Sequence, residues 1–375
     1  MKVLVTGSNG FIGKNLCVAL SSRNDIEFFG YEGDSPREDL EKALGQVDIL
    51  FHLAGVNRPQ NLEDFEIGNA GFTRDICFSL ISQGRSPKII LSSSIQAALE
   101  NPYGRSKRGA EEAVRSYCQK TGATGVIYRL KNIFGKWCRP NYNSVTATFC
   151  QNIAHNLPIQ ISDPQNVLDL TYIDDVVEAF LAELAGAGTE PGGFRFAEPL
   201  PSHQITLGEL ARLIQSFHDH RQTLLLPDLS NRFIQALYAT YLSYLEPGDF
   251  AYSLDIKQDN RGALAEFIKA PTSGQIFISR TRPGITRGDH YHDTKTEKFL
   301  VLEGEAVISL RAIGSSQVVE FTVQGNEFRV VDIPPGYAHT ITNVGNGELV
   351  TLFWASQVFD PAHPDTYPLQ VERKS

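Results

Sequence analysis

The feature that most constrains this chain is a glycine-rich turn directly after a short apolar run at its start. The run Lys2–Thr6 has the character of a buried strand, and the residues from Phe11 onward have helical spacing. Gly7, Gly10 and Gly13 lie between and within them. Glycines let the backbone turn tightly and approach a pyrophosphate, and the following helix offers free N–H groups and a positive dipole end. A plain strand-to-helix turn also uses glycines, but this context favours a dinucleotide-binding fold.

Strand-like and helix-like segments alternate over residues 1–185. Further strands are predicted at Ile26–Gly30, Asp48–Leu53, Lys88–Leu91 and Gly125–Tyr128, and helices at Phe11–Ser22, Glu38–Leu44 and Arg105–Thr121. Strands separated by helices predict an α/β, Rossmann-type doubly wound parallel sheet that is covered on both faces. Residues 206–245 are predicted to be helical, since Thr206 and Glu209 have the spacing of a capping box.

The pattern changes near Glu246-Pro247-Gly248. From Phe250 to Pro368 the chain is rich in β-branched and aromatic residues, with Gly, Pro and Asn recurring between them. Strands are predicted at Gln275–Arg280, Lys298–Leu302, Ala306–Arg311, Phe328–Ile333 and Leu349–Trp354. Short strands at this spacing favour an all-β sandwich or barrel. We therefore expect two domains, residues 1–245 and 246–375, in agreement with a prior of about 150 residues per domain.

Composition narrows the class of protein further. Hydrophobic residues make up 42% and charged residues 21%, which excludes a disordered or fibrous chain. The net charge of −9 argues against nucleic acid or an anionic membrane surface as the main partner. The five cysteines contain no C-x-x-C pair, which favours free thiols in a reducing compartment. No signal peptide and no apolar run of roughly 20 residues is apparent, so a cytoplasmic protein without membrane insertion is expected.

A tyrosine and a lysine at a predicted helix start form the first candidate catalytic pair. Tyr103 and Lys107 are four residues apart and therefore share one helical face. An ammonium group near the phenol is predicted to lower the phenol pKa, so that Tyr103 can exchange a proton with a carbonyl oxygen. Alone, this spacing is common and usually marks surface residues. It becomes specific together with the glycine turn and Ser92-Ser93-Ser94 after the preceding strand.

These motifs resemble the extended short-chain dehydrogenase/reductase family through about residue 243. The matching segments are Val3–Thr6 with the glycine turn, His52–Gly55, Ser92–Ser94, Tyr103–Lys107 and Tyr172–Val176. The resemblance implies hydride transfer at a carbonyl or carbinol of a nucleotide sugar. It makes Tyr103 the acid/base, Lys107 the ligand of the nicotinamide ribose, and Ser94, with Ser93 as its rival, the group that polarises the substrate oxygen. The implied cofactor-binding residues are Gly7, Ser8, Asn9, Gly10, Phe11, Ile12, Gly13, Leu53, Ala54, Gly55, Tyr103 and Lys107.

Two features depart from this family's pattern. Where members often have Arg-Asp before the Tyr172 segment, this chain has Leu168-Asp169, so the nucleotide phosphate would need Arg129, Lys131 or Arg139 instead. An acidic residue at the end of the second strand favours NAD, and a basic one favours NADP. The chain has Glu32 there, and Arg37 lies further on. The choice between NAD(H) and NADP(H) is therefore open.

The second half carries a candidate metal site. His290 and His292 are two apart, so on a strand they point the same way, and neighbouring strands would bring in Glu297 and His339. Three imidazoles and a carboxylate suit Zn, Fe, Ni or Mn. These ligands, with Gly304 and the segment from Pro334 to Asn343, resemble both halves of the cupin motif, and the resemblance favours zinc. The one departure is Phe328, which stands where the motif has glycine.

A reductase fused to a cupin resembles the bifunctional enzymes of capsular and O-antigen polysaccharide synthesis. The likeness spans nearly the whole chain and includes Asn57–Pro59, Ser94–Ala97, Asn101–Gly104, Phe134–Cys138, Pro140–Ser144, Tyr241–Leu245 and Asp365–Tyr367. It implies that the cupin epimerises C3 of a UDP-2-acetamido-2,6-dideoxy-4-ketohexose. The first domain would then reduce the C4 ketone with NADPH, giving UDP-N-acetyl-6-deoxy-L-talosamine. The expected partners are this UDP-sugar and a second copy of the chain in a homodimer or higher homo-oligomer.

Two other functions use the same motifs. The first domain can be an epimerase that retains its NAD. Alternatively, the cupin can be a non-catalytic sensor or assembly module attached to a plain reductase. Tyr291, Lys295, Lys298 and Tyr337 are the residues close in sequence that could carry a proton in the cupin, and most are expected to be structural or surface residues.

Overall fold

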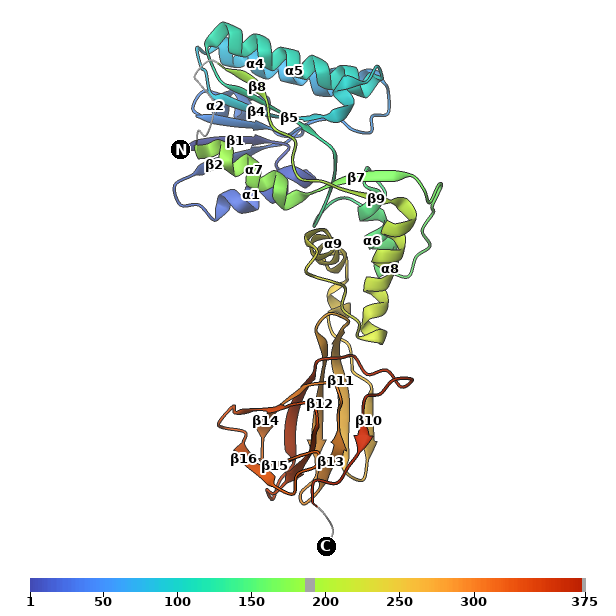
Figure 1. The fold of residues 1–375 in the computed structure, drawn as a ribbon. Coiled ribbons are helices and arrows are strands. Elements are labelled where there is room, and N and C mark those ends of the chain that lie inside the picture. The colour runs from blue at the N-terminus through green and yellow to red at the C-terminus, as the bar shows by residue number, and fades with distance from the viewer. Residues whose placement is uncertain (186–192, 373–375) are drawn as a thin grey trace. The chain divides into compact units, whose positions relative to one another are not determined.

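The computed structural model describes residues 1–185 and 193–372, which divide into two compact units (Figure 1). Unit 1 comprises Met1–Ile214 and Ala236–Leu245, and unit 2 comprises Gln215–Gln235 and Glu246–Ser375. Residues 215–235 cluster with the second unit because Leu225 bridges to Lys269 and the Leu226 N–H donates to the Lys269 carbonyl at 2.8 Å.

Unit 1 is built on a six-stranded parallel sheet. Its strand order is β2-β1-β3-β4-β5-β8, and the strands are β1 (Lys2–Thr6), β2 (Glu27–Tyr31), β3 (Ile49–His52), β4 (Lys88–Ser94), β5 (Gly125–Leu130) and β8 (Phe194–Phe196). Helices cover both faces, as Figure 1 shows: α1 (Phe11–Ser21) and α7 (Ile173–Ala182) on one, and α2 (Arg37–Leu44), α4 (Phe72–Ser82) and α5 (Pro102–Thr121) on the other. Two apolar cores result, one on each face. The predicted parallel α/β fold is therefore confirmed.

Helix α5 begins three residues earlier than the prediction of Arg105–Thr121. The side chain of Asn101 caps it by accepting a hydrogen bond from the Gly104 N–H at 2.7 Å, and Pro102 occupies the first turn. Both are favourable at a helix start. The early start matters because it places Tyr103 in the first turn of α5, one helical turn before Lys107.

A smaller three-stranded sheet and three further helices follow in the chain, and the last two of these helices each extend into unit 2. The elements are β6 (Asn132–Phe134), α6 (Val145–Ala154), β7 (Val167–Tyr172), β9 (His203–Thr206), α8 (Leu207–Thr223) and α9 (Arg232–Leu242). The predicted capping box forms, since Thr206 and Glu209 exchange hydrogen bonds of 3.1 and 3.2 Å. The helical character predicted over 206–245 is present as two helices, because Leu224 takes a left-handed φ of 61° and ends α8 before α9 begins.

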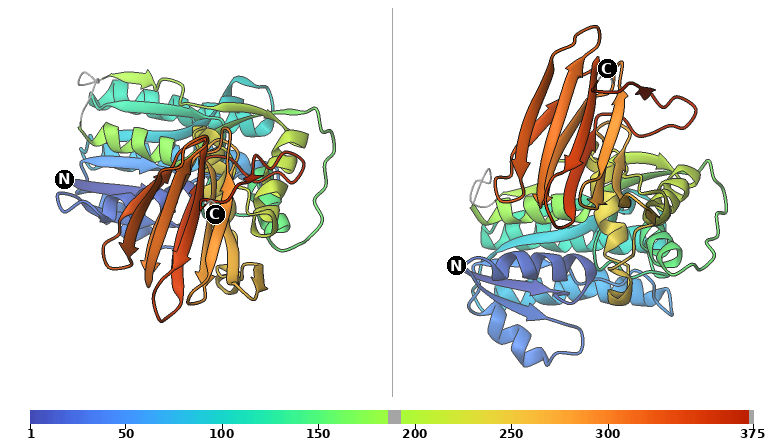
Figure 2. Two further views of the ribbon diagram at one scale, coloured as in Figure 1. Left: turned by 60° about the horizontal axis from the view of Figure 1, so that its bottom comes forward. Right: turned by 90° about the horizontal axis from the view of Figure 1, so that it is seen from below.

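Unit 2 contains two antiparallel sheets, whose strands are coloured orange to red in Figure 2. One has the order β10-β11-β12-β19-β14-β17 and the other β16-β15-β18-β13-β20. Their bounds are β10 (Ile256–Asp259), β11 (Gly262–Ala270), β12 (Gly274–Thr281), β13 (Thr286–Tyr291), β14 (Glu297–Glu303), β15 (Glu305–Ala312), β16 (Val318–Gln324), β17 (Val330–Ile333), β18 (Tyr337–Asn343), β19 (Leu349–Ala355) and β20 (Tyr367–Pro368). The inner faces pack Phe299, Val301, Ile308 and Phe353 into one core. The predicted all-β, cupin-like barrel is confirmed.

All five predicted strands of unit 2 are present, but others were missed. β17 begins at Val330 rather than Phe328, because Phe328 takes a left-handed φ of 46° in the preceding turn. This is the position where the cupin motif has glycine, so the turn forms with an exposed phenylalanine in its place. Strands β10, β11, β16 and β20 were not predicted, and β13 and β18 were expected only as the strands that carry His290 and His339.

Two expectations about the chain as a whole are tested by the structure. All five cysteines are free thiols, as predicted. Among the described residues, no helix combines the length and the apolar character needed to cross a bilayer.

Candidate active site and metal centre

The glycine turn has the tight geometry that the sequence predicted. Gly7 has a φ of 71°, and its N–H donates to the Tyr31 carbonyl at 2.8 Å. A Cβ on Gly7 would lie 2.8 Å from the backbone nitrogen of Ala54, and a Cβ on Gly13 would collide with the Gly7 carbonyl. Only glycine therefore fits at these two positions, and the turn leads directly into the N-terminus of α1.

A cavity of about 530 Å³ lies beside this turn and is lined by seven of the predicted site residues. Its lining includes Phe11, Ile12, Leu53, Gly55, Ser94, Tyr103 and Lys107. The other predicted cofactor residues belong to the adjoining glycine turn and the segment after β3; they are Gly7, Ser8, Asn9, Gly10, Gly13 and Ala54. The turn, the helix N-terminus and the cavity fit a dinucleotide lying across the carboxyl ends of the strands.

Tyr103 lies in the cavity between an aromatic ring and a serine hydroxyl. Its ring centroid is 5.4 Å from that of Phe65. Burial raises the pKa of Tyr103, and a hydrogen bond with Ser94 opposes this rise. The prediction that Lys107 lowers the phenol pKa is wrong for this geometry, because the Lys107 Nζ lies 5.9 Å from the Tyr103 ring centroid and donates elsewhere.

Lys107 is buried and held in place by a main-chain carbonyl. Its Nζ donates to the Ser92 carbonyl at 3.0 Å, and only 6% of the residue is exposed. Burial lowers the pKa of Lys107 to about 8, although the Glu111 carboxylate opposes the shift. At pH 7 the ammonium is therefore mostly protonated and faces the cavity as a hydrogen-bond donor.

The two candidate serines have different partners. Ser93 Oγ donates to Glu111 at 2.6 Å and is 4% exposed, so it is committed to a structural contact. Ser94 is partly exposed in the cavity and interacts with Tyr103. The geometry thus favours Ser94 over Ser93 as the group beside a substrate oxygen. Sequence reasoning missed the Glu111 contact, because the contact joins two different elements, β4 and α5.

The three basic residues proposed for a nucleotide phosphate also differ. Arg129 makes a bidentate pair with Glu111, at 2.9 and 2.6 Å, and Arg139 packs over the Tyr142 ring. Lys131 lines the cavity, where it pairs with Asp169 at 2.6 Å. Of the three, Lys131 is the one that lines this cavity.

Glu32 lies at the end of β2, against the glycine turn. Its Oε1 accepts a hydrogen bond from Ser8 Oγ at 2.8 Å and a second from the Asn9 N–H. Arg37, the basic residue that follows Glu32 in the sequence, forms ion pairs with Glu41 and Asp75 on the surface. The carboxylate therefore stands at the turn without a basic neighbour among the described residues to offset it.

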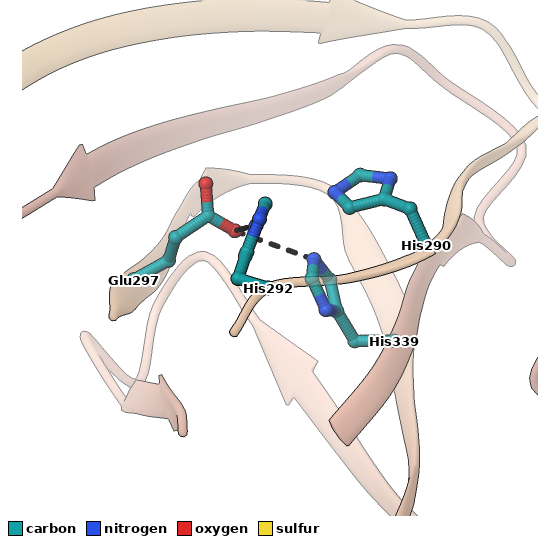
Figure 3. Close-up of side chains that lie close together, drawn as sticks. All are labelled: His290, His292, Glu297 and His339. Carbon is teal, nitrogen blue, oxygen red and sulfur yellow. Dashed lines mark ion pairs between the residues drawn. The ribbon is translucent and has the colours of Figure 1, made fainter. Parts of the chain in front are cut away.

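The second site is a compact group of four side chains in unit 2. His290, His292, Glu297 and His339 point toward one another (Figure 3), and their ligand atoms all lie within 4.8 Å of each other. His290 is on β13 and His292 just follows it, His339 is on β18, and Glu297 begins β14 in the other sheet. The structure thus brings together the four residues predicted to bind a metal.

The electrostatics of this group fit a divalent cation. The Nε2 atoms of His292 and His339 each lie 3.3 Å from Oε2 of Glu297, yet both are buried without a hydrogen-bond partner in the described part of the chain. Burial lowers the pKa of His290 to about 4, so its imidazole is neutral at pH 7. Burial alone raises the pKa of Glu297, but the two imidazoles bring it down to about 2. Neutral imidazoles and a carboxylate are the forms that bind metal.

A C-terminal segment orients one of these imidazoles, which sequence reasoning missed. His292 Nδ1 lies 2.6 Å from the Asp365 carbonyl, so the Nδ1–H donates there and Nε2 faces the site. The Asp365 carboxylate accepts from the backbone N–H groups of Asp293, Thr294 and Lys295 at 2.8–3.0 Å. The one sequence signal for this contact was that Asp365–Tyr367 belongs to the segments that resemble the bifunctional polysaccharide enzymes.

His290, His292, Glu297 and His339 are called the tetrad below. The residues near the tetrad that could carry a proton have other partners. Lys295 Nζ donates to the Pro364 carbonyl at 2.8 Å, and Tyr291 stacks on Tyr367. Lys298 forms an ion pair with Asp332, and Tyr337 packs against the core. These contacts agree with the expectation that most of the four are structural or surface residues.

Comparisons with known families match both units. Residues 3–193 match the NAD dependent epimerase/dehydratase family, and residues 257–367 match the polysaccharide biosynthesis C-terminal domain. The UDP-2-acetamido-2,6-beta-L-arabino-hexul-4-ose reductase of Pseudomonas aeruginosa is 43% identical over 371 residues, which cover 99% of each chain.

Solved structures give the same result. The capsular polysaccharide assembling protein CapF from Staphylococcus aureus aligns with a TM-score of 0.91 and 44% identity, over 99% of this chain and 100% of that one. A UDP-glucuronic acid 4-epimerase from Bacillus cereus in complex with NAD aligns with a TM-score of 0.51 and 21% identity over 58% of this chain and 84% of that one. At this identity, the second likeness shows the fold alone.

If the tetrad binds a metal, removing one of its imidazoles should lower the metal content of the protein. His339→Ala removes a buried ligand from the centre of the group, and we expect bound zinc to fall from about one per chain to well below half after dialysis, since losing one of four ligands weakens the site strongly. Elemental analysis by mass spectrometry measures it. His363→Ala, which removes an imidazole that is 87% exposed, serves as the control and should retain the metal. Full zinc occupancy in His339→Ala would contradict this ligand set.

Proposed function

The chain belongs to the NAD dependent epimerase/dehydratase family, in its form with a polysaccharide biosynthesis C-terminal domain, and from this we propose that it is a bifunctional nucleotide-sugar enzyme. Its substrate is a UDP-2-acetamido-2,6-dideoxy-4-ketohexose. Unit 2 inverts C3 and unit 1 then reduces the C4 ketone, giving UDP-N-acetyl-6-deoxy-L-talosamine for capsule or O-antigen synthesis. One observation carries the proposal: a single chain holds both the Ser94-Tyr103-Lys107 cavity and a separate buried tetrad.

Reduction in unit 1 needs a proton donor at the carbonyl oxygen. A bound nicotinamide dinucleotide supplies the hydride for C4. Tyr103 donates its phenol proton to O4 as the alcohol forms, and Ser94, beside it, polarises the same oxygen by a hydrogen bond. Lys107 presents its buried ammonium to the cavity, where it holds the nicotinamide ribose.

Epimerisation in unit 2 needs a stabilised negative charge at O4. The C4 ketone acidifies the neighbouring C3 hydrogen, and a divalent metal supplies Lewis acidity at the ketone oxygen. The three imidazoles and Glu297 hold such an ion, while Phe299, whose ring lies 5.7 Å from that of His339, keeps one side of the site apolar. Exclusion of water strengthens the electrostatic stabilisation.

The order of the two steps follows from their chemistry. The C3 hydrogen is acidic only while C4 is a ketone, so epimerisation precedes reduction. Reduction then fixes the new configuration, because the alcohol no longer acidifies C3. Fusion of the two activities in one chain is consistent with this dependence.

The choice between NADH and NADPH depends on the carboxylate of Glu32. The family resemblance implies NADPH, whereas a carboxylate at the end of β2 accepts hydrogen bonds from the adenine ribose of NADH and repels a 2′-phosphate. The contacts of Glu32 therefore support NADH, in contrast to the resemblance.

Tyr103→Phe separates the two activities. Loss of the phenol proton is expected to lower the rate of ketone reduction at least about a hundredfold, within the 10²- to 10⁴-fold range of general acid catalysis. Zinc content and exchange of the C3 hydrogen should be unchanged, because unit 2 is untouched. Cofactor oxidation at 340 nm and proton NMR measure the two steps, with Tyr252→Phe, an exposed tyrosine of unit 2, as the control.

The same experiment discriminates the alternatives. A Tyr103→Phe variant with full reductase activity would overturn the assignment of unit 1. A chain that purifies with bound NAD and needs no added cofactor would instead be a resident-NAD epimerase. A wild-type protein that reduces the ketone without C3 exchange would leave unit 2 as a non-catalytic module.

Glu32→Gln tests the cofactor assignment by binding alone. The wild type should bind NADH at least about tenfold more tightly than NADPH, a difference of about 1.4 kcal/mol, because like charges repel at short range. The neutral amide should reduce this ratio several-fold. Fluorescence titration gives the dissociation constants, and Glu27→Gln, an exposed acid on the same strand, should leave the ratio unchanged. Tighter binding of NADPH to the wild type would contradict the assignment.

A further inference from the structure

A β-bulge in β13 places an arginine on the same inner face as the tetrad. Arg287 pairs with Ile341, Gly288 with Thr340, and His290 with His339, so that Asp289, with a left-handed φ of 57°, is the extra residue. Residues three apart on a regular strand face opposite sides. The extra residue cancels this alternation, and Arg287 and His290 therefore face the same way.

The side chain of Arg287 reaches into the barrel. Its Nε donates to Thr281 Oγ1 at 3.0 Å, and Thr281 belongs to β12 in the opposite sheet, where it is 1% exposed. Thr281 and Phe277 are four residues apart on β12, so their side chains face the same side of the sheet. Phe277 packs in the core, and this side is therefore the inner one. In register, Arg287 lies two ladder steps from the pair His290–His339, or about 7 Å along the strand.

Arg287 also lines a basic pocket. The pocket has a volume of about 210 Å³, and its lining includes Lys257, Asp259, Arg261 and Arg287. Three cations thus face one carboxylate, and Asp259 is paired with Arg261 at 2.6 Å. Burial and the charge of Arg261 lower the pKa of Arg287 and Asp259 opposes the shift, so a second guanidinium in the same pocket disfavours the charged form of Arg287. Such an arrangement is relieved by an anion that both can bind.

The inner faces of β12 and β19 carry two hydroxyl groups that have no partner among the described residues. Ser279 on β12 and Thr351 on β19 are directly opposite in register and are 1% and 0% exposed. Neither hydroxyl has a hydrogen-bond partner in the described part of the chain. Ser279 shares the inner face with Thr281 and lies two ladder steps nearer the row of Glu297. Buried hydroxyls of this kind are costly unless a polar molecule satisfies them.

We propose that the pocket of Lys257, Arg261 and Arg287 is the diphosphate subsite of unit 2, which binds the nucleotide sugar so that its sugar ring lies at the tetrad. The proposal rests on the proposed function, since it names the anchor for that epimerisation. A diphosphate matches the pocket because it carries two adjacent negative groups, and guanidinium forks bind phosphate oxygens bidentately. The hydroxyls of Ser279 and Thr351 then face the sugar.

The test uses UDP as the probe and the intact chain loaded with one Mn²⁺, from which free metal has been removed. Mn²⁺ at the tetrad relaxes nearby phosphorus nuclei, so the ³¹P signals of UDP should broaden strongly compared with the zinc-loaded protein. Arg287→Gln should abolish most of this broadening and weaken UDP binding at this site about tenfold. Arg287→Lys, which keeps the charge, should restore part of it. Arg280→Gln, which removes an exposed arginine next to Thr281, should behave as the wild type.

The outcomes separate this proposal from the proposed function. If the ³¹P signals of UDP broaden equally in the wild type and in Arg287→Gln, the subsite assignment is wrong. It is also wrong if these signals do not broaden in a wild-type protein that retains Mn²⁺. Broadening by inorganic phosphate as strong as that by UDP would show a simple phosphate site and overturn the diphosphate assignment. If the chain takes up neither Mn²⁺ nor zinc, the metal centre of the proposed function fails. Calorimetry then decides the subsite, because Arg287→Gln must still bind fewer UDP molecules than Arg280→Gln does.

Discussion

The buried contact between Glu297 and two imidazoles is the constraint on which the second site depends. Two Nε2 atoms and a carboxylate oxygen meet at 3.3 Å in an interior where unpaired polar atoms are expensive. A divalent cation would resolve this cost, since one ion can bind all of them at once. The strand pairing of unit 2, the bulge at Asp289 and the Asp365 segment all serve to hold these groups in one place.

Unit 1 depends on a comparable placement of polar groups at the carboxyl ends of parallel strands. The cap at Asn101 starts α5 early enough to put Tyr103 in the cavity, and the Ser92 carbonyl holds Lys107 one turn later. Glu111 accepts hydrogen bonds from both Ser93 and Arg129, so these two side chains are engaged in the fold rather than with substrate. The chemistry that remains available is proton donation to an oxygen by Tyr103, assisted by Ser94.

The sequence predicted what short-range spacing encodes. The glycine turn, the capping box at Thr206 and the His290–His292 pair follow from local geometry, and each is present in the fold. The long-range partners were invisible: Glu111 with Arg129, and Asp365 with His292, join distant segments. The expected lowering of the Tyr103 pKa was wrong because burial outweighs a lysine that points to another acceptor. The bulge at Asp289 was missed because nothing in the local pattern requires an extra residue there.

The central claim is that C3 is epimerised while C4 is still a ketone and that reduction follows in the same chain. The most direct measurement is the full reaction of the wild type in deuterated water with unlabelled reduced cofactor, with proton NMR of the UDP-sugar product. The account predicts deuterium at C3 and ordinary hydrogen at C4, since C3 is reprotonated from solvent and C4 receives hydride. A product with ordinary hydrogen at C3 and the configuration of the starting sugar would contradict it.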